Sequence, residues 1–60
     1  MPLYRVRVKC IPDRYSDGVR STMFKFKVYA TNDLIAMQLG QIRASELGYQ
    51  VVHFDSVEEI

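Results

Sequence analysis

Apolar and polar side chains alternate along two stretches in the first half of the chain. In residues 3–11 the even positions hold Tyr, Val, Val and Cys, and the odd positions between them hold cations. In residues 22–30 apolar side chains again occupy the even positions from Phe24 onward, with two lysines between them. A period of two is typical of a half-buried strand, whose successive side chains point to opposite faces. The pattern predicts two strands, each with one apolar and one basic face.

The segments around these strands favour a hairpin loop and then one helix. Pro12 lacks a backbone N–H and ends the first ladder, and residues 16–18 have the chemistry of a turn tip. After the second strand an apolar-rich run without proline predicts a helix over residues 33–47. Asn32 suits the N-cap, and Gly48 suits the left-handed conformation that ends a helix.

Residues 49–57 are rich in aromatic and β-branched side chains and predict a third strand. Phe54 has the largest apolar area to bury, so alternation predicts that Val52 and Phe54 face inward. Val51 and His53 are then expected to face outward. Five of the seven acidic side chains are expected to lie away from the basic face of the hairpin; they are Asp33, Glu46, Asp55, Glu58 and Glu59.

The order strand, strand, helix, strand restricts the topology. A right-handed crossover after the second strand leaves a gap that the first strand fills, so the expected sheet order is 2-1-3 with antiparallel neighbours. We predict a single α+β domain over residues 1–60: a three-stranded antiparallel sheet with one helix packed on one face, ββαβ. The other face is expected to have no cover within the chain.

Two apolar stripes run along the predicted helix. The first contains small residues that let the helix lie close to the sheet; its members are Ala36, Met37, Gly40, Ala44 and Leu47. The second consists of Ile35, Leu39 and Ile42. Either this second stripe belongs to a wide core-facing surface, or it is a self-association surface. A 60-residue domain buries only about 60% of its unfolded surface, which favours a homodimer.

Composition narrows the class of protein. Hydrophobic residues make up 48% of the chain and charged residues 25%, as in globular proteins. No run of about 20 apolar residues and no basic-then-apolar leader is present, so we expect a cytoplasmic location and no membrane span. The single cysteine, Cys10, fits a reducing compartment. One Cys and one His are too few for a structural zinc site.

The basic side of the predicted hairpin is the main candidate site. By alternation it gathers Arg5, Arg7, Lys9, Lys25, Lys27 and Tyr29. Such a face can bind an anionic partner, with the aromatic ring available for stacking. It can equally be a solvated face whose charges prevent aggregation. The hairpin loop offers secondary contacts at Arg14, Tyr15 and Arg20.

No catalytic constellation is apparent in the sequence. Cys10 and His53 are expected on opposite faces of the sheet, so they cannot form a nucleophile and base pair. The three glycines do not form a phosphate-binding loop. We therefore expect no enzymatic activity, no cofactor, no metal and no small-molecule substrate.

Several short segments resemble a known family. They are Tyr4-Arg5-Val6-Arg7-Val8, residues 26–32, Ala36 and the closing Val57-Glu58-Glu59-Ile60. Together they look like the archaeal ribosomal LX type of large-subunit protein, and small phage-encoded proteins share the outline, including inhibitors of bacterial defence systems. Gly48-Tyr49-Gln50 stands where the ribosomal proteins have a basic segment. The resemblance implies the fold and leaves protein and nucleic acid open as partners.

Two functions are compatible with these patterns. The first is a small non-enzymatic protein-interaction module, such as a phage or mobile-element accessory factor or inhibitor that docks on a larger protein. The alternative is a nucleic-acid-binding module that uses the basic sheet face. The surplus apolar stripe of the helix favours the first function, and the row of Arg and Lys residues favours the second.

Overall fold

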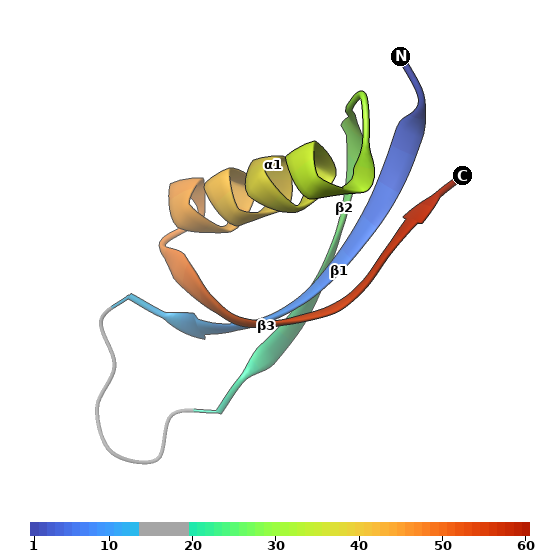
Figure 1. The fold of residues 1–60 in the computed structure, drawn as a ribbon. Helices are drawn as coiled ribbons and strands as arrows, with labels where there is room; N and C mark the ends of the chain where they lie inside the picture. Colours follow the sequence, from blue (N-terminus) through green and yellow to red (C-terminus); the bar gives the residue numbers. More distant parts are fainter. Residues whose placement is uncertain (14–19) are drawn as a thin grey trace.

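The computed structural model describes residues 1–13 and 20–60, which form three strands and one helix. In chain order these are β1 (Leu3–Pro12), β2 (Thr22–Tyr29), α1 (Asp33–Glu46) and β3 (Tyr49–Glu59). The sheet order is β2-β1-β3, and β1 is antiparallel to both neighbours. Figure 1 shows α1 lying across one face of this sheet. The predicted ββαβ fold is confirmed, and the expected turn tip at residues 16–18 lies outside the described residues.

The β1–β2 ladder is regular along its whole length. It pairs Leu3 with Tyr29 at one end and Cys10 with Thr22 at the other, without a shift of register. Even-numbered residues of both strands therefore share the face below the helix, as alternation predicts. Val6, Val8 and Cys10 of the central strand are fully buried there.

Local sequence determines both ends of α1. The side-chain oxygen of Asn32 accepts a hydrogen bond of 2.9 Å from the backbone N–H of Ile35, as expected of an N-cap. At the other end Gly48 has a φ of +84°, and its N–H donates to the carbonyl of Ser45 at 3.0 Å. The Gly48 carbonyl in turn accepts from the Asp13 N–H at 2.9 Å. This bond ties the end of the helix to the end of β1.

Small residues bring α1 unusually close to the sheet. Ala36, Gly40 and Ala44 are its buried residues, in line with the predicted small-residue stripe. A Cβ atom placed on Gly40 would lie only 2.8 Å from Cγ1 of Val6, closer than such atoms can approach. Leu47 was expected on the same stripe and is 57% exposed, because it caps the helix beyond the turns that contact the sheet.

Strand β3 departs from simple alternation. Its pairing with β1 shifts twice, between Arg7 and Val8 and between Lys9 and Cys10. Each shift leaves one extra residue in β3, a β-bulge that reverses which side chains face the core. The inward residues therefore follow a spacing of three: Val51, Phe54 and Val57 all pack against the core. The prediction for Phe54 is confirmed, whereas the predictions that Val52 faces inward and Val51 outward are wrong; Val52 is 50% exposed.

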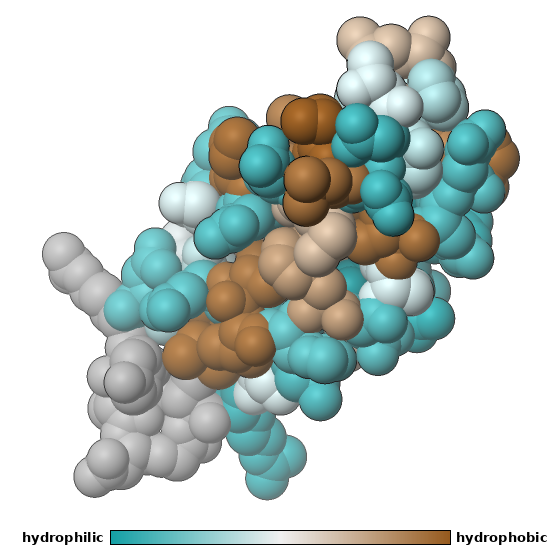
Figure 2. Space-filling view, in the orientation of Figure 1, coloured by the Kyte–Doolittle hydropathy of each residue, from teal (hydrophilic) through white to brown (hydrophobic). Residues whose placement is uncertain are grey.

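Aromatic side chains extend the core toward the hairpin loop. The rings of Phe24 and Phe26 stack with centroids 5.7 Å apart, and Tyr49 meets Phe24 edge-on at 4.9 Å. All three rings are only partly buried. Figure 2 shows hydrophobic side chains, interrupted by hydrophilic ones, across the helix-bearing side of the molecule.

Replacing Gly40 by alanine should lower the free energy of unfolding by about 1–3 kcal/mol, because the added methyl group must displace the buried Val6 side chain. Helix propensity alone predicts the opposite sign, since alanine is favoured over glycine by about 1 kcal/mol. Urea unfolding monitored by circular dichroism measures the difference. Gln41→Ala, at the next and exposed helix position, is the control and should change stability by less than about 0.5 kcal/mol. Stability equal to or above that of the wild type in Gly40→Ala would contradict the close approach.

Candidate interface for an anionic partner

The sheet face opposite α1 carries the odd-numbered side chains of β1 and β2. In the β1–β2 register Arg5 lies directly opposite Lys27, and Arg7 lies directly opposite Lys25. Lys9 extends the row, opposite Met23. Five of the eight Lys and Arg residues of the chain thus emerge on one surface, which we call the charged face.

A shallow hollow of about 420 Å³ opens in the middle of the charged face. It is lined by Arg5, Arg7, Lys25, Lys27 and Glu58. Like charges directly opposite on neighbouring strands are destabilising, by a few tenths of a kcal/mol up to about 1 kcal/mol per pair. The hollow therefore concentrates positive charge at a cost to the fold, and an anion placed there would reduce that cost.

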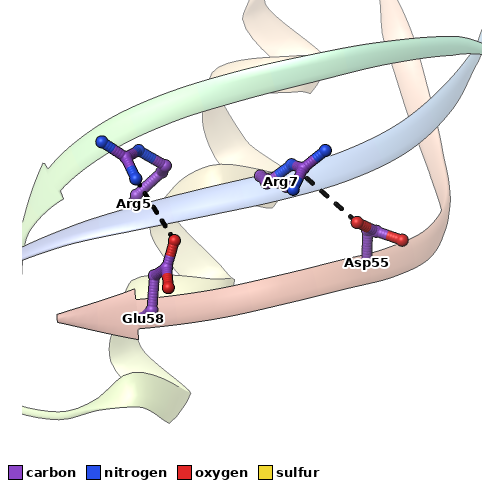
Figure 3. A network of polar contacts seen from close by, with 4 residues as sticks. All are labelled: Arg5, Arg7, Asp55 and Glu58. Atoms are coloured by element: carbon purple, nitrogen blue, oxygen red, sulfur yellow. Dashed lines mark hydrogen bonds and ion pairs between the residues drawn. The ribbon is translucent and has the colours of Figure 1, made fainter.

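Two carboxylates of β3 reach the charged face, as Figure 3 shows. Glu58 Oε1 lies 3.3 Å from Arg5 Nη1, and Asp55 Oδ2 lies 3.9 Å from Arg7 Nε. The expectation that these acidic residues lie away from the basic face is wrong. Strand β3 continues to Glu59, which brings Glu58 opposite Arg5, and Asp55 is the extra residue of a bulge beside Arg7.

These ion pairs compensate the arginines only in part. The Arg5 and Glu58 side chains are 37% and 56% exposed, so their attraction is screened and worth at most about 1 kcal/mol. At 3.9 Å the contact of Arg7 with Asp55 is too long for a hydrogen bond. Arg7 Nε is shielded from solvent and has no hydrogen-bond partner within residues 1–13 and 20–60. The Arg7 side chain as a whole is nevertheless 42% exposed, so the outer nitrogens of its guanidinium group can reach a ligand on this face.

The lysines of the charged face differ from its arginines in their ion pairing. Lys9, Lys25 and Lys27 are exposed, and the described part of the chain contains no ion pair to any of them. Beside them Met23 is 44% exposed and Tyr29 64% exposed. The outward side of β2 is thus two uncompensated cations between a methionine and a tyrosine.

The loop residues proposed as secondary contacts are described only in part. Arg20 is exposed just before β2 begins. Arg14 and Tyr15 lie outside the described residues. Only Arg20 can therefore be related to the charged face; Ser21 separates it along the chain from Thr22, the first residue of β2.

The second helix stripe is divided between core and surface. Leu39 packs against the core cluster, whereas Ile35 is 36% exposed and Ile42 is 54% exposed. Leu34 in the first turn is also 61% exposed. The core-facing alternative thus holds for Leu39, whereas self-association through the exposed Ile35 and Ile42 stays a prediction.

Cys10 and His53 lie in different environments, one in the core and one on the surface. Cys10 is fully buried and faces Val51, whereas His53 is exposed opposite Lys9. Burial raises the pKa of the Cys10 thiol above its ordinary value of 9.0, so the residue is a neutral part of the core. The expected placement of Cys10 on the covered face and of His53 on the open face is thus confirmed.

Within residues 1–13 and 20–60, no three His, Cys, Asp or Glu side chains come close enough to hold a metal ion. In the same ranges, no helix is long and apolar enough to cross a membrane.

No protein-family model, curated protein or solved structure matches this chain. The resemblance to ribosomal and phage-encoded proteins stays a prediction.

The raised pKa of Cys10 predicts a pH-dependent contribution to stability. The folded state favours the neutral thiol, so this stabilisation is complete below the ordinary pKa of 9.0 and is lost as the pH rises through the raised value. Wild type should be more stable than Cys10→Ala near neutral pH, and the gap should narrow at about pH 10. Urea unfolding of both chains at the two pH values tests this, since all other titrating groups are shared. A gap that stays constant would contradict the burial of the thiol.

Proposed function

We propose that this chain is a small non-enzymatic protein-interaction module that docks on a larger protein through its charged face. The observation that carries the proposal is the difference between the two basic strands. Arg5 and Arg7 of β1 are paired with carboxylates of the same chain, whereas Lys25 and Lys27 of β2 have no such pairing among the described residues. The anion that completes this surface is then supplied by a partner.

The composition of the charged face favours a protein partner over nucleic acid. Exposed Met23 and Tyr29 flank the lysines, and Met, Tyr and Arg are enriched in protein interfaces. Asp55 and Glu58 on the same face would repel a phosphate backbone. The resemblance to small phage-encoded inhibitors supports the further proposal that the chain is an accessory factor or inhibitor of a phage or mobile element.

Nucleic-acid binding is the second candidate. Lys9, Lys25 and Lys27 form a row of exposed cations, with the Tyr29 ring available for stacking. If three such lysines contacted phosphates of duplex DNA, the logarithm of affinity would fall with the logarithm of salt concentration at a slope of about −3. Salt titration of labelled DNA and RNA therefore distinguishes this candidate from a protein partner.

A photo-cross-linker tests the proposed protein partner. Benzoylphenylalanine in place of Tyr29 should form an adduct with one cellular protein, because this exposed ring lies beside the lysines of the charged face. The adduct should survive nuclease and disappear when Lys25→Glu and Lys27→Glu are added. The matched control carries the cross-linker at Arg43, an exposed helix position off the row of Leu34 and Ile42. Identical adducts from both sites, or an adduct that nuclease removes, would contradict the proposal.

We also propose that a second copy of the chain covers the exposed apolar part of α1. Leu34, Ile35 and Ile42 leave apolar side chains on the surface of a domain whose core is small. Burial of apolar area is worth about 25 cal/mol per Å², so pairing of two helices would stabilise both copies. Figure 1 shows α1 on one side of the sheet, and strand alternation puts the charged face on the other, so this dimer leaves the charged face available.

The dimer is tested by a charge at its centre. Ile42→Glu should convert a dimer into a monomer in sedimentation experiments at high micromolar concentration, because the carboxylate would be buried without a partner. Gln41→Glu adds the same side chain at the neighbouring exposed position and should leave the dimer intact. Leu39 is avoided, since its contact with the core would confuse dissociation with unfolding. A monomeric wild type would exclude this part of the proposal.

A further inference from the structure

The outer edge of β2 is an unpaired strand edge of unusual regularity. The sheet order places β2 at one side, and no strand of the described ranges pairs with its outer edge. Its pairing with β1 runs from Thr22 to Tyr29 without a bulge, and it contains no proline. The backbone N–H and C=O groups along this edge are therefore in position to accept another strand.

The edge of β3 is less suited to such pairing. Two bulges, at Val52 and Asp55, interrupt its register with β1. Bulges bend and twist an edge strand and hinder the addition of a further strand. Its carboxylates are also already engaged with Arg5 and Arg7. The two edges of the sheet thus differ, and β2 is the one open to an extended partner.

The charges on the sheet indicate what such a strand would carry. Across the charged face the order is acidic on β3, basic on β1 and basic on β2. An acidic strand beside β2 would place carboxylates next to Lys25 and Lys27, as β3 places carboxylates next to the arginines of β1. Opposite charges on paired strands are favourable, whereas the present pairs of like charge are not.

The helix side of β2 indicates which side chains the other positions of the added strand would carry. Phe24 and Phe26 point toward the helix side and are only partly buried, with their rings stacked. Side chains of an added strand alternate between the two faces. Those on the helix side would cover the exposed area of the phenylalanines, and should therefore be apolar.

We propose that β2 binds an extended segment of the partner protein as a fourth strand, and that this segment alternates acidic and apolar residues. Its carboxylates lie beside Lys25 and Lys27 on the charged face, and its apolar side chains pack beside Phe24 and Phe26. This inference rests on the proposed function and adds the chemistry of the partner. A second copy of the chain is a poor occupant, because antiparallel pairing of β2 with itself would set lysines against lysines.

Selection from a displayed library of random peptides of about ten residues, with the full chain as bait, tests the inference. Recovered peptides should carry carboxylates two positions apart with an apolar residue between them. A recovered peptide should bind about tenfold more weakly to the double variant Lys25→Gln, Lys27→Gln. The control Arg43→Gln removes an exposed cation of the helix and should leave the affinity for the peptide unchanged. Peptides without alternation, or no enrichment, would overturn the inference.

Backbone methylation of the selected peptide tests strand pairing itself. In a paired strand only every second N–H points to its neighbour, so methylating one alternate set of amides should abolish binding and methylating the other should preserve it. Amide signals of residues 22–29 should shift on binding, and those of 49–59 should shift less. Equal effects of both methylated sets, or binding located at β3, would overturn the inference. A specific adduct from the cross-linker at position 29 would then still support docking on the charged face.

Discussion

The close approach of Gly40 to Val6 sets the distance between the helix and the sheet. Because a Cβ atom at Gly40 would approach Val6 Cγ1 to 2.8 Å, the helix backbone lies directly on the central strand. Ala36 and Ala44, one turn to each side of Gly40, are the other buried residues of the helix. Val6 and Val8 of β1 are fully buried, although no large side chain of the helix is itself buried. Close approach of small residues thus replaces the bulky interdigitation of larger domains.

A core made in this way has consequences for both faces of the sheet. On the helix side the larger apolar residues are displaced to the margins, where Ile42 and Phe26 remain partly exposed. On the other side nothing within the described residues covers the sheet, so its side chains are free to serve binding. The directly opposed pair Arg5 and Lys27 costs the fold some stability. A partner that supplies negative charge to this face would offset that cost.

Much of this arrangement follows from local sequence, and the remainder depends on tertiary contacts. The regular strands β1 and β2 could be predicted because alternation is uninterrupted there, and Asn32 and Gly48 mark the helix ends by their own chemistry. In β3 two bulges shift the inward face to a spacing of three, so simple alternation misplaced Val52. The same bulges, with the continuation of the strand to Glu59, brought carboxylates to the basic face, where sequence patterns did not place them. The only sign of this placement in the sequence was the spacing of the charges: Asp55 and Glu58 lie three residues apart, whereas Arg5 and Arg7 lie two residues apart.

The most direct test of this account is the proton distance between the helix and the central strand in solution. Nuclear Overhauser spectra should show a strong contact between the α-protons of Gly40 and a methyl group of Val6, because a Cβ atom placed on Gly40 would lie only 2.8 Å from Val6 Cγ1. The same spectra should show no contact between any α1 proton and the side chains of Arg5 or Arg7, which emerge on the opposite face. A missing contact between Gly40 and Val6, or helix contacts to those arginines, would contradict both the packing and the open charged face that depends on it.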